Sequence, residues 1–265
     1  MVLNIRNEAK IMSSKKMELP SNLEQQIVTG IMSGYKSYLD ERIRAKQNLK
    51  VSAAYAWTKG NHIDSEVAVA VENNQTIDFS TAKAGYVWEY LQFTATSPKS
   101  DETGKALIFI KGSRSAKKNF DGKKVSQPDK NYLREYAKIN QHLFKSGQVS
   151  GTSTNHSVQL ELPINEIRSS ASDSFKTSDF DRFYIVTYEI DKAYQISSIK
   201  LTMPDPSSMS LVIVKDLTDL IQNSIVTIET EEFDAVRGDK VPDAQYTDQP
   251  FGYEIAAEEE QNPES

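Results

Sequence analysis

Residues 84–112 read AGYVWEYLQFTATSPKSDETGKALIFIKG, and they bring β-structure into a chain that begins with helical patterns. Valine, tyrosine, tryptophan and phenylalanine are enriched over 85–94 and isoleucine and phenylalanine over 106–110, which is typical of strands. The polar segment 96–105 between them contains a proline and a glycine and predicts a hairpin loop. A short apolar run at 77–79 precedes the pair and adds a further strand.

Upstream of these strands, the apolar residues recur at helical spacing. Ser21 and Glu24 match a capping box, and the pattern after them predicts an amphipathic helix from about residue 21 to 46. A shorter helical stretch covers 51–57, and Asn61 is placed to cap a third helix. The N-terminal part of the chain is therefore expected to be helical.

Downstream of the strands, the spacing of the apolar residues changes again. Residues 131–144 show a helical pattern, and a Gly- and Ser-rich stretch follows it. Short links between the later strands favour an antiparallel meander. The strands expected after this helix are 157–162, 183–190, 197–203 and 210–214. N-terminal helices, a β-hairpin, a helix and a C-terminal antiparallel meander make the expected fold class α+β.

The domain organisation follows from the same pass along the chain. Residues 1–19 form a loose leader, and 20–228 form a single α+β domain with one possible internal boundary near 146–156. Residues 229–265 form an acidic tail that is expected to be disordered, because its aliphatic residues are few and its charge is high.

Composition excludes several classes of protein. The chain has no cysteine, which rules out disulfides, thiolate metal sites and a cysteine nucleophile. It contains neither a 20-residue apolar run nor a secretory signal, so a soluble cytoplasmic protein is expected. No phosphate-binding loop, dinucleotide fingerprint or catalytic triad is present, and no cofactor is expected. His62 and Glu66 share a helix face, but without a third ligand a surface pair is favoured over a metal site.

Charge is distributed unevenly. Residues 229–265 contain 12 acidic and 2 basic residues, whereas 1–228 carry a net charge of +4 within a chain of net charge −6. A second biased segment, 111–124, is interpreted as a Gly- and Ser-rich loop that is either simply solvated or contacts phosphate. Its basic residues are Lys111, Arg114, Lys117, Lys118, Lys123 and Lys124.

One catalytic hypothesis is a restriction-nuclease-like site. Such sites hold Mg²⁺ between two carboxylates and place a lysine two residues after the second one. Here Leu91 occupies that position, so Lys105 or Lys111 would have to substitute; otherwise Glu89 simply faces outward from a half-buried strand. The candidate residues for this site are Glu66, Asp78, Glu89 and Lys111.

Several segments together resemble a known family. They are AGYVWEYLQF, GKALIFIKGSR, NYLREYAKINQHLF and FYIVTYEIDKAYQISSIKLTMPDPSSMSLVI, in this order. The order resembles an uncharacterised domain family of Gram-positive bacteria and their phages, over roughly residues 20–225. The resemblance implies an α+β domain and a bacterial or phage setting, and it assigns no activity and no site residue.

Two functions are therefore expected as alternatives. The first is a non-enzymatic interaction protein of phage or mobile-element origin, whose opposed charged surfaces bind a host protein. The second is a nucleic-acid-binding protein with a degenerate nuclease-like site at Asp78 and Glu89, in which the tail covers 111–124 when nucleic acid is absent. A protein partner is expected in the first case and nucleic acid in the second, and no metal and no membrane are expected in either.

Overall fold

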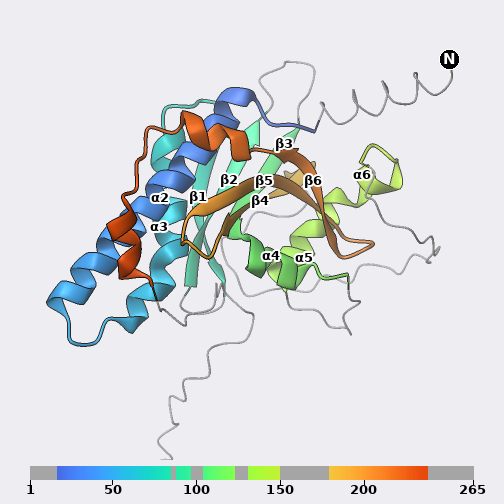
Figure 1. The fold of residues 1–265 in the computed structure, drawn as a ribbon. Coiled ribbons are helices and arrows are strands. Elements are labelled where there is room, and N and C mark those ends of the chain that lie inside the picture. The colour runs from blue at the N-terminus through green and yellow to red at the C-terminus, as the bar shows by residue number, and fades with distance from the viewer. Residues whose placement is uncertain (1–16, 85–87, 97–103, 123–130, 150–178, 238–265) are drawn as a thin grey trace, which may run out of the picture.

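The fold is that of a computed structural model, which describes residues 17–84, 88–96, 104–122, 131–149 and 179–237 (Figure 1). Helices and a six-stranded sheet confirm the predicted α+β class. In chain order, with η for 3₁₀ helices, the elements are α2 (Ser21–Asn48), η1 (Ala53–Thr58), α3 (Lys59–Val71), β1 (Ile77–Ala84), β2 (Trp88–Thr96), β3 (Lys105–Gly112), α4 (Ser113–Asn119), α5 (Tyr132–Ala137), η2 (Lys138–Asn140), α6 (Gln141–Lys145), β4 (Arg182–Ile190), β5 (Ile196–Asp205), β6 (Ser210–Asp216), η4 (Thr218–Asn223) and η5 (Thr230–Ala235).

All six strands belong to one mixed sheet in the order β1-β2-β3-β4-β5-β6. Neighbouring strands are antiparallel except β3 and β4, which are parallel and pair from Ala106–Arg182 to Gly112–Tyr188. The chain returns from β3 to β4 through the segment that contains α4, α5 and α6. The predicted hairpin and the predicted meander are thus halves of one sheet, joined across the expected boundary near 146–156.

Side chains alternate between the two faces of this sheet, and each face has its own apolar core. Ile108 and Tyr184 face α2 and α3, whereas Leu107 and Phe183 belong to the core on the opposite side, with α4 and α5. Figure 1 shows the long helix pair against one side of the sheet and the short helices on the other. The result is a three-layer arrangement in which the central strands β3 and β4 are buried from both sides.

Two glycines set the close contact between α2 and α3. A Cβ on Gly34 would lie 2.4 Å from the Cα of Ile63, and one on Gly30 would lie 2.5 Å from the Cα of Val67. No side chain fits at either position, because real Cβ atoms do not approach other carbons so closely. The two helices therefore pack backbone against backbone along this face.

Two predicted helix caps are wrong. Pro20 is the N-cap of α2, without a side-chain hydrogen bond, and Glu24 is instead buried and accepts a hydrogen bond of 2.8 Å from Lys215 Nζ. Helix α3 starts at Lys59, with Thr58 rather than Asn61 as its N-cap. In the first case the ion pair with β6 takes the carboxylate away from the helix end.

Two segments expected to be irregular are ordered. Residues 111–119 are not a loop, since they form the end of β3 and helix α4. The predicted tail is ordered at its start: η5 packs on α2, and Phe233 is buried against Tyr35. The strand predicted at 157–162, residues Lys123 and Lys124, and the tail beyond Arg237 lie outside the described residues.

Candidate interaction surfaces

The end of the α2–α3 pair extends past the sheet (Figure 1). We call residues 46–59 the hairpin tip; they comprise the last residues of α2, the connecting loop, η1 and the first residue of α3. Its loop is held from inside by Arg42, which is buried and donates a hydrogen bond of 2.7 Å from Nη1 to the carbonyl oxygen of Ser52. This contact and the close packing of the two helices make the tip a preorganised structure.

Apolar side chains are exposed on the hairpin tip. Val51 is 83% exposed and Leu49 is 42% exposed. The other large exposed hydrophobic side chains of the described residues stand singly along the chain, so these two are the closest pair in sequence. Isolated exposed hydrophobic residues are ordinary, and contiguous exposed apolar patches are the ones that mark contact surfaces.

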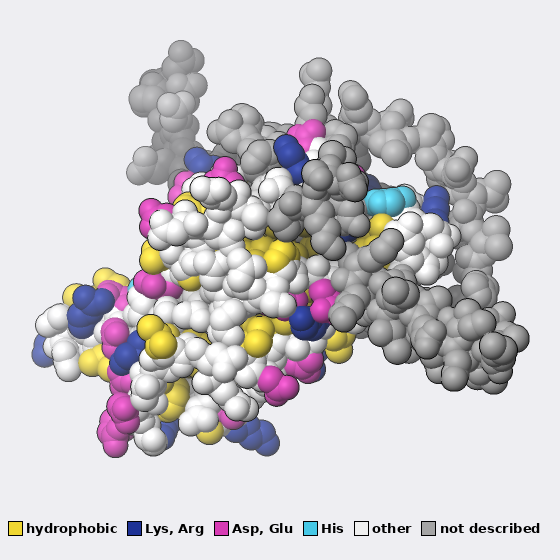
Figure 2. Space-filling view, turned by 90° about the horizontal axis from the view of Figure 1, so that it is seen from above, with side chains coloured by type: hydrophobic (Ala, Val, Ile, Leu, Met, Phe, Trp, Pro, Cys, Tyr) yellow, Lys and Arg dark blue, Asp and Glu magenta, His cyan; other side chains and the backbone are white. Residues whose placement is uncertain are grey.

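The surroundings of these apolar residues are basic. Residues 42–63 contain no acidic residue, and Lys46 and Lys50 are exposed on either side of Leu49. Lys59 is half-buried at the start of α3, and Arg44 is exposed and pairs with Glu41 at 3.0 Å. At the left of Figure 2, the same end of the helix pair shows hydrophobic and basic side chains next to each other. The tip thus combines an apolar centre with positive charge.

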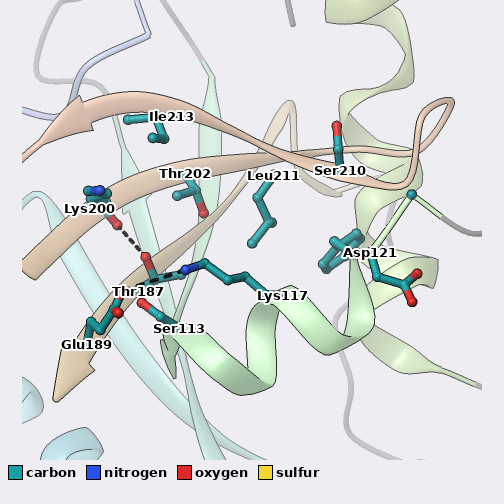
Figure 3. Close-up of a pocket in the computed structure, with 12 residues that line it drawn as sticks. Ser113, Lys117, Asp121, Thr187, Glu189, Lys200, Thr202, Ser210, Leu211 and Ile213 are labelled. Carbon is teal, nitrogen blue, oxygen red and sulfur yellow. Dashed lines mark hydrogen bonds and ion pairs between the residues drawn. The ribbon is translucent and has the colours of Figure 1, made fainter. Parts of the chain in front are cut away.

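A second surface lies on the opposite face of the sheet, where α4 and β4–β6 enclose an open pocket of about 420 Å³ (Figure 3). Lys117 of α4 reaches across it to Glu189 of β4, with a distance of 3.6 Å between Nζ and Oε2. Thr187 lies on its floor and donates to the carbonyl oxygen of Lys200 at 3.5 Å. The lining residues are Ser113, Lys117, Phe120, Asp121, Gly122, Thr187, Glu189, Lys200, Thr202, Ser210, Leu211 and Ile213.

Helix α4 displays part of the predicted basic segment next to this pocket. Arg114, Lys117 and Lys118 are exposed, as phosphate contacts must be. Lys111 is an exception and corrects the prediction: it lies in β3, is only 2% exposed and cannot present its ammonium group at the surface.

Lys111 instead belongs to a buried polar cluster. Its Nζ lies over the ring of Tyr90, 5.1 Å from the centroid. Asp64 of α3, 6% exposed, accepts a hydrogen bond of 3.1 Å from the backbone N–H of Leu91. The pairing of β2 with β3 ends at Phe93 and Ile108. Leu91 lies outside this paired part of β2, and its backbone N–H binds Asp64.

Burial dominates the electrostatics of this cluster. It raises the pKa of Asp64 to about 6, an effect that the charge of Lys111 and the hydrogen bond from Leu91 oppose. It also lowers the pKa of Lys111, against the attraction of Asp64. Gln92 extends the cluster by donating from Nε2 to the hydroxyl groups of Tyr90 and Tyr136, at 3.1 and 3.0 Å. The cluster is enclosed in the protein, next to the part of β2 that is no longer paired with β3.

The candidate carboxylates do not converge. In the antiparallel pair of β1 and β2, Asp78 lies opposite Thr94 and Glu89 lies opposite Lys83. The positions of the two carboxylates are therefore five residues apart along the strands, or about 17 Å. Asp78 Oδ1 accepts a hydrogen bond of 2.8 Å from the backbone N–H of Phe79 at the edge of the sheet. Across the described residues, no three acidic or histidine side chains gather in a group that could hold a metal ion.

Glu66 and His62 lie on α3. Glu66 is half-buried. His62 has its Nδ1 3.0 Å from Ser37 Oγ and packs edge-on against Tyr38, and burial lowers its pKa. These contacts favour a role for His62 in joining α3 to α2.

Sequence reasoning missed Asp64 and the hairpin tip, although both left signals. Asp64 is four residues before Ala68 and seven before Val71, which puts it on the buried face of α3. The tip was visible as a segment with basic but no acidic residues that also contains Leu49 and Val51.

No family model, curated protein or solved structure matches this chain. In the described part of the chain, no helix has the length and apolar character required to cross a membrane.

Proposed function

We propose that this protein is a non-enzymatic interaction protein whose hairpin tip binds an acidic surface of a partner protein. The observation that carries the proposal is that Leu49 and Val51 are both exposed on a segment that contains no acidic residue. The lysines of this segment are Lys46, Lys50 and Lys59. An apolar centre with a polar rim is the usual anatomy of a protein–protein interface.

Preorganisation adds to this support. Arg42 holds the loop, and Gly30 and Gly34 allow the helices to pack closely up to the tip. A surface that is ordered before binding loses less conformational entropy when the complex forms. The basic charge speeds encounter with an acidic partner and lowers the affinity for basic ones.

The test is affinity capture from a nuclease-treated lysate of a Gram-positive bacterium, with matched variants of the full chain. We expect the wild type to capture a discrete protein partner. Capture should be lost in Val51→Asp and in the double variant Lys46→Glu, Lys50→Glu. The control is Arg114→Glu, Lys118→Glu on α4, which carries the same change of charge on the opposite face of the sheet. Equal capture by the tip variants and the control would disprove the proposal.

A second candidate function is nucleic-acid binding through α4. Its support is that Arg114, Lys117 and Lys118 are exposed on one short helix beside an open pocket. Basic side chains in such a cluster displace counterions from phosphates, which makes binding depend steeply on salt. Asp78 and Glu89 take no part in this candidate function, since the strand register separates them.

Fluorescence anisotropy with labelled single-stranded and duplex oligonucleotides tests this second candidate. Binding at low salt should weaken in Arg114→Ala and Lys118→Ala but not in Lys138→Ala, which removes an exposed lysine that pairs with Glu135. No binding by the wild type at about 20 mM salt would eliminate it, because screening is weak there.

A further inference from the structure

We infer that the acidic segment 238–265 binds the hairpin tip of its own chain and thereby competes with the partner. This regulation rests on the tip being the binding surface proposed above. Three observations lead to it: the place where the segment leaves the fold, the distance to the tip and the complementary charge.

The segment leaves the fold beside α2. Phe233 is 3% exposed and stacks on Tyr35, with 6.5 Å between the ring centroids. Glu232 of η5 forms an ion pair with Lys36 of α2, and this contact raises the pKa of Lys36. Glu232 and Glu229 also form a capping box at the start of η5. These contacts fix the starting point of 238–265 on α2 (Figure 1).

The tip is close to this starting point. Lys46 lies ten residues after Lys36 on α2, which corresponds to about 15 Å along the helix. About five extended residues cover this distance, and 28 residues follow Arg237. The helix pair itself connects the two places, so the chain does not need to pass around the sheet.

Charge and side-chain types are complementary. The segment 238–265 carries eight carboxylates and one lysine, a net charge of −7. The tip and its flanks carry no carboxylate from residue 42 to 63. The aromatic residues Tyr246, Phe251 and Tyr253 supply apolar groups that can cover Leu49 and Val51. Acidic residues around aromatic ones suit a basic surface with an apolar centre.

The alternative target within the chain is α4. Its Lys117 already pairs with Glu189, and Asp121 lies in the same pocket. The helix also lies on the other face of the sheet from η5 (Figure 1). The tip is therefore the nearer surface and the one without carboxylates of its own.

The experiment uses a photo-crosslinking amino acid at position 51 of the full chain, purified alone, followed by mass spectrometry. We expect crosslinks within one chain to peptides from 238–265. The yield of these crosslinks should fall several-fold in the double variant Lys46→Glu, Lys50→Glu. It should fall likewise in the triple variant in which Glu258, Glu259 and Glu260 are changed to Gln. Raising the ionic strength to about 0.5 M should also lower it, because salt screens the attraction. The matched control places the same probe at Glu135, an exposed position on α5.

Three results would overturn the inference. They are equal crosslinking of the tail from positions 51 and 135, preferential crosslinking from a probe at Lys118, and crosslinked dimers, which would assign the tip to the tail of a second copy. Because no partner is present, these results are independent of the capture experiment. Loss of partner capture and loss of tail crosslinks are therefore distinguishable failures.

Discussion

Gly34 of α2 lies so close to Ile63 of α3 that the Cβ of any other residue at position 34 would be 2.4 Å from the Cα of Ile63. The neighbouring contact of Gly30 with Val67 repeats this relationship one turn earlier. Replacing glycine by alanine in an open helix stabilises it by about 1 kcal/mol. At this interface the same substitution must separate two backbones.

We therefore expect Gly34→Ala to lower the free energy of unfolding by about 2 kcal/mol, since overpacking a tight contact outweighs the gain in helix propensity. Urea denaturation followed by circular dichroism measures the effect. Ser33→Ala, at the adjacent position on α2, is the control and should change stability little. A more stable Gly34→Ala protein would show that the helices are farther apart than described.

The buried carboxyl group of Asp64 predicts a pH dependence of stability. In the unfolded chain it ionises near 3.8, whereas in the folded chain it holds its proton up to a pH of about 6. The folded state therefore gains stability from this proton at low pH and loses that contribution as the pH rises from about 4 to about 6. The difference corresponds to at most about 3 kcal/mol.

Asp64→Asn removes this titration and keeps an oxygen that can accept from Leu91 N. We expect the variant to become more stable relative to the wild type between pH 4 and pH 7, when both are unfolded with urea. A stability difference that stays constant over this range would show that Asp64 titrates equally in both states.

The start of the C-terminal segment predicts two unequal effects. Phe233→Ala should cost about 3 kcal/mol of unfolding free energy, because it leaves a cavity against Tyr35. Glu232→Gln should cost about 0.5 kcal/mol, since its ion pair with Lys36 is near the surface. Thermal and chemical denaturation of both variants would compare them. Equal and small effects would mean that η5 is not packed on α2.

Substitution at the hairpin tip should separate binding from stability. Val51 is almost fully exposed, so Val51→Asp should change the free energy of unfolding by no more than about 0.5 kcal/mol. The same variant is expected to lose the captured partner. A large loss of stability would mean that Val51 packs within the fold, and its effect on capture would then say nothing about an interface.

Local pattern predicted much of the fold. Helix α2 was expected from about residue 21 to 46 and spans Ser21–Asn48, and strands β4, β5 and β6 agree with their predicted ranges to within about two residues. Helical and strand periods are set by neighbours along the chain, which explains this agreement. The cap at Glu24 was predicted wrongly because its true partner, Lys215, lies far away in sequence.

The amino-acid sequence by itself determined the α+β class, the approximate ranges of α2 and of β4, β5 and β6, and the uneven charge. Only the tertiary structure decided that β3 and β4 pair in parallel, that Asp64 and Lys111 share a buried cluster, and that Phe233 docks on α2. Each of these contacts joins segments tens of residues apart. Their free energy comes from burial and pairing across the fold, which no short stretch of sequence records.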